Sequence, residues 1–207
     1  MKTKTFRTIL ILEILSFLIL LIVLILATYH TYLNRASQTF QAGMSAYQNA
    51  EYLTAYQHFE EITTIFRYTN LPEIPAAYSR MDECSLLLFA QFSQQQQDLD
   101  SAIHALEVFL DKYPASPAVT DTEDWLARLY FQKAEQLKAF SNYPAALQMY
   151  LNLQSRFHSN IIDNVIDANI AGLFVSWGDD LQANGDLALS IEKYSIVLDI
   201  YPSTSSF

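Results

Sequence analysis

The residue types that most often carry chemistry are scattered along this sequence. The four histidines, His30, His58, His104 and His158, stand in four different segments, and no two are one helical turn apart. A transition-metal site needs several converging ligands, so we predict no metal. The four glycines are too far apart to form a phosphate-cradling loop, and no Ser-His-Asp arrangement is recognisable. We therefore predict a protein that is not an enzyme and binds no cofactor.

Two short acidic groups offer the oxygen ligands that hard cations prefer. They are Asp98 with Asp100, and the neighbouring residues Asp179 and Asp180. Both stand where we expect a helix to start, or in the turn before it. There a carboxylate usually accepts hydrogen bonds from the free N–H groups of the first turn. We predict that these acids cap helices.

Composition narrows the fold and the partners. The 207 residues include only 4 Gly and 6 Pro, against 13 Tyr and 13 Phe, which predicts long helices with short connections. The formal net charge is −10. This sign argues against a nucleic acid as partner and against electrostatic docking on anionic lipid. Cys84, the one cysteine, lies in the apolar run MDECSLLLFAQF, so we predict a buried thiol.

An apolar run near the N-terminus predicts a membrane span. Residues 9–27 contain one charge, Glu13, and a helix of this length covers roughly 28 Å, about the thickness of the hydrocarbon layer. We assign 1–8 to a short basic cytoplasmic segment and 9–29 to a transmembrane helix. The basic residues before the run predict a cytoplasmic N-terminus and an extracytoplasmic remainder. The alternative is a cleaved signal peptide and a secreted or periplasmic protein, although no A-x-A cleavage site follows.

The rest of the chain repeats one pattern four times. A large residue marks the centre of each copy: Phe59, Leu106, Tyr150 and Tyr194. A small residue stands four positions earlier: Ala55, Ala102, Ala146 and Ser190. Another small residue stands sixteen positions earlier: Gly43, Ala90, Ala134 and Gly178. An aromatic residue stands seven positions later: Phe66, Tyr113, Phe157 and Tyr201. Proline follows this aromatic in two copies, at Pro114 and Pro202.

The pattern predicts pairs of antiparallel helices. Two helices approach closely only where side chains are small, so the small residues of the first helix should face those of the second. The large residue then fills the space one turn away. The closing proline ends the second helix, because it lacks an N–H and clashes with the preceding turn.

These positions resemble the tetratricopeptide repeat, a unit of 34 residues with two helices. On that frame the units span 36–69, 83–116, 127–160 and 171–204. The segments between them, 70–82, 117–126 and 161–170, make this chain's period longer, and we expect them to lengthen each first helix. Thr120 or Asp121 is expected to cap the third first helix. The predicted fold is therefore all-α: one transmembrane helix (9–29), a linker (30–35) and an α-solenoid of about four helix pairs (36–207).

The stretch LDSAIHALEVFLDKYPASPAVTDTEDWLARLY, residues 99–130, is most similar to repeat proteins of the bacterial envelope. That group includes accessory proteins of outer-membrane assembly and cell division. The resemblance implies a non-catalytic scaffold that binds proteins. Solenoids usually end in a polar capping helix, and none follows Pro202. We therefore expect either that the chain is a fragment, or that a partner or another copy covers its last repeat.

The resemblance also implies a binding groove on the first helices, for a protein or peptide partner. The groove positions combine aromatic, Met and amide side chains with charged ones. They are Phe40, Met44, Tyr47, Cys84, Leu87, Gln91, Gln94, Arg128, Phe131, Glu135, Lys138, Val175, Asp179 and Gln182. The alternative is that many of these side chains pack inside the superhelix.

Three hypotheses about function remain open. The first is a membrane-anchored adaptor that presents the groove to an extracytoplasmic protein. The second is a subunit of a cell-envelope assembly complex, with the possibility of self-association through the last repeat. The third is the repeat portion of a longer chain associated with an enzyme.

Overall fold

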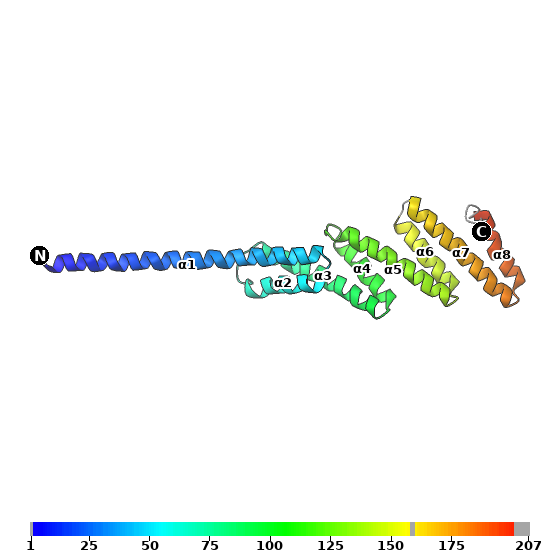
Figure 1. The fold of residues 1–207 in the computed structure, drawn as a ribbon, viewed down its shortest axis with the longest axis horizontal. Helices are drawn as coiled ribbons and strands as arrows, with labels where there is room; N and C mark the ends of the chain where they lie inside the picture. The colour runs from blue at the N-terminus through cyan, green and yellow to red at the C-terminus, as the bar shows by residue number, and fades with distance from the viewer. Residues whose placement is uncertain (1, 158–159, 201–207) are drawn as a thin grey trace. The chain divides into compact units, whose positions relative to one another are not determined.

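The protein is all-α, as predicted, and its helices pack as sequential pairs (Figure 1). A computed structural model describes residues 2–157 and 160–200 of the chain. Within these residues there are eight helices: α1 (Lys2–Gln48), α2 (Tyr52–Ile65), α3 (Glu73–Gln95), α4 (Leu99–Lys112), α5 (Val119–Ala139), α6 (Tyr143–Arg156), α7 (Asn160–Ala183) and α8 (Leu187–Ile200). The chain divides into two compact units, Met1–Leu88 and Phe89–Phe207.

The first helix of each pair is longer than the second. Each of the second helices α2, α4, α6 and α8 has 14 residues, whereas α3, α5 and α7 have 23, 21 and 24. Most of the segment 70–82 lies in α3, most of 117–126 in α5, and all of 161–170 in α7. The prediction that these segments lengthen the first helices is confirmed.

The predicted cap of α5 is wrong. Thr120 and Asp121 lie inside the helix, and its N-cap is Ala118, whose own side chain makes no capping hydrogen bond. The Ala118 N–H instead donates to the Ser116 hydroxyl oxygen at 3.3 Å. A short Ser turn therefore precedes the helix, and α5 starts two residues earlier than Thr120-x-x-Glu123 suggested.

The apolar N-terminal segment belongs to one uninterrupted helix. Helix α1 contains 47 residues, and the large apolar side chains between Leu12 and Leu26 are exposed. It is the one helix in the described part of the chain that is long and apolar enough to cross a membrane, a test that a signal sequence also passes. Residues 30–35, predicted to be a linker, continue the helix without a break.

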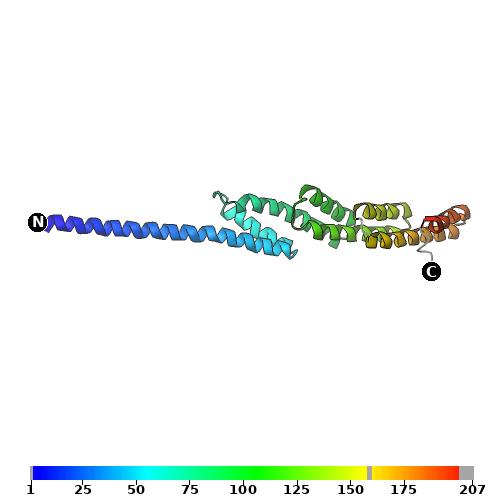
Figure 2. The same ribbon diagram turned by 90° about the horizontal axis from the view of Figure 1, so that it is seen from above.

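Helix α1 reaches α2 one turn after the apolar run. The Tyr32 hydroxyl donates to the Ile65 carbonyl oxygen at 2.9 Å, and the Tyr32 and Phe66 rings lie 4.6 Å apart. Arg35 pairs with Glu61 at 2.7 Å. The first helix pair is thus built directly on the extension of the apolar segment (Figure 2).

Within a pair, a small residue of the first helix lies against the central large residue of the second. A Cβ atom added to Gly43 would come 2.7 Å from Cε1 of Phe59, and one added to Gly178 would come 2.5 Å from Cε1 of Tyr194. Such distances are not tolerated without movement of the ring. This differs from the prediction, which placed small residues opposite small residues: here the ring itself covers the glycine.

The same positions are closed to solvent in the other pairs. Ala90 and Ala134, which replace the glycines, and Leu106 and Tyr150, which occupy the central position, are all fully buried. The second set of small residues is buried too: Ala55, Ala102, Ala146 and Ser190. The repeated positions therefore form the packed centre of each pair.

The aromatic position after each central residue ends the second helix. Phe66, Tyr113 and Phe157 are the C-caps of α2, α4 and α6, and each N–H donates to the carbonyl four residues earlier. Helix α2 ends there although Arg67, rather than proline, follows. Tyr201, Pro202 and His158 lie outside the described residues.

The turn inside every pair has the same backbone conformation. One residue adopts a positive φ, between 54° and 87°: Ala50, Gln97, Ser141 and Gly185. Its N–H donates to the carbonyl three residues back, and the next N–H donates to the carbonyl five residues back at 2.9 Å. This is the Schellman ending of a helix, in which the left-handed residue is usually glycine. Only the last of the four turns has glycine there.

Two glycines of α7 provide a matched test of ring packing. We expect Gly178→Ala to lower the free energy of unfolding by about 1–3 kcal/mol, because the new methyl group collides with the Tyr194 ring. Gly172→Ala, which meets no atom within 4 Å, should raise it by about 0.5–1 kcal/mol through helix propensity. Chemical denaturation of both variants measures the difference, and equal effects would contradict the packing described here.

The left-handed turns predict a second pair of effects. Ala50→Gly should stabilise the protein by about 0.5–1 kcal/mol, because glycine adopts a φ of 58° without steric cost. Gly185→Ala, at a φ of 87°, should destabilise it by about 1 kcal/mol or more. Thermal unfolding followed by circular dichroism checks both, and a destabilised Ala50→Gly variant would show that the turn is not strained.

Candidate protein-interaction surfaces

The three histidines among the described residues lie on three different helices. His30 lies on α1, where its Nδ1 is 3.1 Å from Asn34 Nδ2; His58 lies on α2 and His104 on α4. Among residues 2–157 and 160–200, no group of three or more His, Cys, Asp or Glu side chains is placed to hold a metal ion.

Asp98 is a helix cap, as predicted. Its carboxylate accepts a hydrogen bond from the Ser101 N–H at 3.1 Å at the start of α4. Hydrogen bonding from Ser101 lowers the pKa of this carboxyl below its ordinary value. The carboxylate therefore serves the end of α4.

The capping prediction is wrong for Asp179 and Asp180. Both lie within α7 and accept hydrogen bonds from other helices. Asp179 Oδ1 accepts from the Tyr194 hydroxyl of α8 at 2.6 Å. Asp180 Oδ2 accepts from the Tyr143 hydroxyl at 2.5 Å and from the Ser141 hydroxyl at 2.8 Å. These two bonds lower the pKa of Asp180 and join the third pair to the fourth.

Tyrosine–carboxylate bonds recur elsewhere in the second unit. Tyr150 donates to Glu135, which lies fifteen residues earlier, the same offset as between Tyr194 and Asp179. Tyr130 of α5 donates to Glu107 of α4. Burial, followed by the hydrogen bond to Glu107, raises the pKa of Tyr130 to about 12, and burial with the bond to Glu135 raises the pKa of Tyr150. These carboxylates are engaged in holding helices together.

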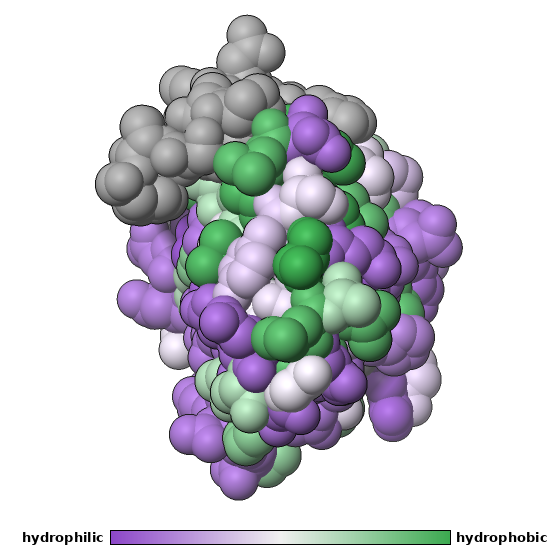
Figure 3. Space-filling view, turned by 90° about the vertical axis from the view of Figure 1, so that its right-hand side faces the viewer, coloured by the Kyte–Doolittle hydropathy of each residue, from purple (hydrophilic) through white to green (hydrophobic). Residues whose placement is uncertain are grey.

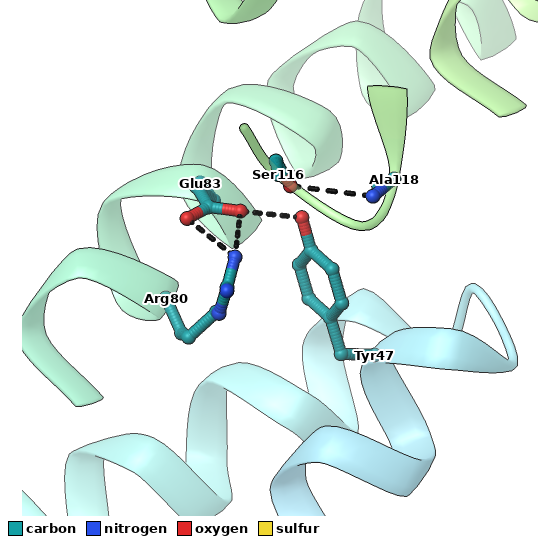
Figure 4. Close-up of polar contacts among 5 residues, drawn as sticks. All are labelled: Tyr47, Arg80, Glu83, Ser116 and Ala118. Carbon is teal, nitrogen blue, oxygen red and sulfur yellow. Dashed lines mark hydrogen bonds and ion pairs between the residues drawn. The ribbon is translucent and has the colours of Figure 1, made fainter. Parts of the chain in front are cut away.

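Five of the predicted groove residues lie in the first unit, and three of them are buried: Tyr47, Cys84 and Leu87. Tyr47 is 2% exposed and Leu87 0%, so both pack in the core, while Phe40 and Met44 are half-buried. The Tyr47 hydroxyl donates to Glu83 Oε2 at 2.6 Å, and Arg80 Nη1 donates to both oxygens of Glu83 at 2.6–2.7 Å (Figure 4). Tyr47 is therefore committed to a buried polar cluster between α1 and α3.

Cys84 lies next to this cluster and is buried, as predicted. Burial, with a smaller effect from Glu83, raises the pKa of its thiol to about 12. A thiol in this state contains almost no thiolate at neutral pH, so we expect it to react slowly with alkylating reagents.

The remaining predicted groove residues lie in the second unit. Gln91, Gln94, Glu135 and Lys138 are half-buried, and Gln94 accepts from the Trp125 indole N–H at 2.8 Å. The exposed members are on α5 and α7: Arg128, Phe131, Val175, Asp179 and Gln182. The predicted set is thus divided between buried, bonded and accessible side chains.

Aromatic members of the predicted row pack on the repeated centre. Phe40 lies 5.6 Å from Phe59, and Phe131 lies 6.0 Å from Tyr150 in an edge-on arrangement. Both pairs have the same sequence offset of nineteen residues. These rings support the helix pair while leaving part of their surface accessible: Phe131 is 36% exposed.

The outer face of α8 is apolar and accessible; an uncapped last repeat was expected from the sequence, but its exposed side chains were not named. Leu187 is 59% exposed and Ile191 67%. At the equivalent positions of earlier pairs the side chains are buried or half-buried, because the next first helix packs on them. These side chains are Leu99, Ile103, Tyr143 and Leu147. Comparing the repeats would have identified the face, since both positions are occupied by large apolar or aromatic residues in the last three copies.

We call Leu187, Ile191 and Leu198, which share one side of the helix at about 100° per residue, the α8 face. Figure 3 looks at this end of the molecule and shows apolar side chains among polar ones. These three side chains are at least 59% exposed. In the part of the chain that the structure describes, no helix covers them.

A small hollow of about 210 Å³ lies beside the turn into α4. It is lined by Gln97, Leu99, Gln132 and Gln136. At three equivalent positions in the next pair, Ser141, Tyr143 and Asp180 are hydrogen-bonded together. Small-molecule sites usually measure about 300–1,000 Å³, so this hollow, where Leu99 stands in place of the larger Tyr143, is too small for a built ligand site.

The sequence matches no protein-family model, and a search among curated proteins finds no relative of it.

The buried and exposed members of the predicted row should respond differently to truncation. Tyr47→Ala removes a fully packed ring and leaves Glu83 without one donor, so we expect a loss of about 3–5 kcal/mol in unfolding free energy. Arg128→Ala, on an exposed side chain, should change it by no more than about 0.5 kcal/mol. Denaturant titrations measure both. A Tyr47→Ala variant of normal stability would place Tyr47 on the surface instead.

Proposed function

We propose that the protein is a membrane-anchored, non-catalytic scaffold that binds another protein through its helix pairs. The exposed apolar segment of α1 supports the anchor. The accessible α8 face supports the binding role, and it is the observation that carries the proposal. Large apolar faces of this kind are rarely left in water and usually mark interaction sites.

We also propose that the helix pairs are of the tetratricopeptide-repeat type. Support comes from four pairs with small residues at fixed offsets, from rings seated on Gly43 and Gly178, and from a common turn. The long first helices distinguish this chain from the 34-residue unit of that family.

The direction of membrane insertion follows from charge. Lys2, Lys4 and Arg7 precede the apolar run, and basic residues are retained on the cytoplasmic side. In this arrangement the helix pairs are extracytoplasmic. Cleavage of the apolar segment as a signal sequence would release the same domain into the same compartment.

The α8 face suits an apolar helix as its partner. In the second unit, α5 packs on α4 and α7 on α6, so a helix lying on α8 would occupy the equivalent place. Such a helix needs apolar side chains opposite Leu187 and Ile191. The first-helix row, with Phe131 and Arg128 exposed, is a second surface of mixed chemistry that fits a peptide.

Photocrosslinking of the full-length chain in its native membrane tests the proposal. We expect p-benzoylphenylalanine at position 191 to form a discrete adduct with another protein. At Leu53, which is exposed to the same extent as Leu187, it should form none. Ile191→Asp should weaken binding of the identified partner by about ten- to hundredfold, since burial of an isoleucine contributes about 1.5–3 kcal/mol.

The pattern of adducts separates the possible outcomes. Crosslinks between two copies of the chain would indicate self-association through the α8 face. Adducts only from position 131 would move the binding site to the first-helix row. Equal labelling at 53, 131 and 191 would contradict a defined binding surface.

A further inference from the structure

The connection between α2 and α3, residues 66–72, follows the end of α2 that is nearest to the apolar part of α1 (Figures 1 and 2). Helix α2 runs antiparallel to α1, so its last residues are the ones nearest to the apolar run. The bond from the Tyr32 hydroxyl to the Ile65 carbonyl, 2.9 Å long, fixes this end at the level of Tyr32.

The height of this connection above the apolar run follows from helix geometry. Tyr32 comes five residues after Ala27, so its Cα lies about 7.5 Å further along the axis of α1. Side chains of a helix lean toward its N-terminus, which brings the Tyr32 hydroxyl closer still to the apolar run. The polar layer on each side of a bilayer is about 5–8 Å thick. Because α1 has no break between these residues, the end of α2 falls within that layer.

The side chains of the connection suit this layer. Tyr68 is 86% exposed, and the Arg67 guanidinium lies over its ring at 4.4 Å. Arg67 is the only charged residue in the segment 66–72. Tyr29 and Tyr32, one helical turn apart on α1, lie near the level of this connection. Tyrosines concentrate at membrane interfaces because the ring is apolar and the hydroxyl polar.

We propose that residues 66–72 dock into the lipid headgroup layer of the membrane that α1 crosses, with Tyr68 and Arg67 as the contacts. This inference rests on the proposed membrane anchor. The acidic net charge of the chain, −10, does not favour attachment by charge alone, so the docking depends on α1 and on the aromatic residues. The first helix pair is then seated on the bilayer surface.

Depth measurement by spin labelling tests the docking. A nitroxide is attached to single cysteines in the full-length chain, reconstituted in phosphatidylcholine vesicles, and its collisions with oxygen and with a water-soluble nickel chelate are compared. The positions are Leu18→Cys in the apolar run, Asn70→Cys in the connection and Leu53→Cys at the opposite end of α2. The parent chain controls for Cys84, which is buried.

We expect the nickel collision rate at position 70 to be several-fold lower than at 53, and the rate at 18 to be the lowest. Equal rates at 70 and 53, with 18 protected, would overturn the docking and leave the anchor intact. An unprotected position 18 would overturn the anchor and, with it, the docking. Tyr68→Trp gives an independent reading: lipids brominated near the headgroup should quench its added fluorescence, and no quenching would count against the proposal.

Discussion

The contact of one ring or large apolar side chain with one glycine or alanine sets the geometry of every helix pair. Phe59 on Gly43 and Tyr194 on Gly178 leave no room for a Cβ atom, so the two helices meet at one spacing and one register. Alanine occupies the equivalent positions in the other two pairs, and Ala90 and Ala134 are as fully buried as Leu106 and Tyr150. Packing of this density does not tolerate an added methyl group without displacement. The lengths of the helices and the ends of α2, α4 and α6 are arranged around this contact.

Polar contacts then join one pair to the next. In the second unit, Tyr143 stacks on Trp177 with ring centroids 5.7 Å apart and donates to Asp180. The equivalent residue Leu99 has no hydroxyl, and a hollow lies beside it. In the last pair the equivalent residue is Leu187, which is largely exposed. One repeated position therefore occurs in three settings: a hydrogen-bonded joint in the third pair, an apolar residue beside a hollow in the second, and an exposed side chain in the fourth.

The helix pairs could be predicted from the sequence because their small and large residues recur at fixed offsets, and few arrangements besides packed helices require such spacing. The left-handed turns could not, since Ala50, Gln97 and Ser141 have no preference for a positive φ and only Gly185 signals it. The roles of Asp179 and Asp180 were also hidden, because their donors Tyr194, Tyr143 and Ser141 are brought near by the fold.

The candidate surface was predicted only in part, and for a similar reason. A helical row identified by analogy does not show which side chains face inward, so Tyr47 and Leu87 were included although both are buried. The α8 face is found only by comparing the repeats. The positions of Leu187 and Ile191 hold large apolar or aromatic residues in the last three copies, and these residues are covered in two copies and exposed in the last. Burial of this kind depends on the neighbour rather than on the residue itself.

Because α1 is continuous, the number of residues between the apolar run and Tyr32 determines how the first helix pair is oriented about the axis of α1. An α-helix advances about 1.5 Å and turns about 100° per residue. Removing a single residue from this stretch would therefore turn the first helix pair, from Tyr32 onward, by more than a quarter of a revolution about the axis of α1, while hardly changing its distance from the apolar run. The direction in which the first helix pair faces is thus set by the number of residues in that stretch rather than by their identity.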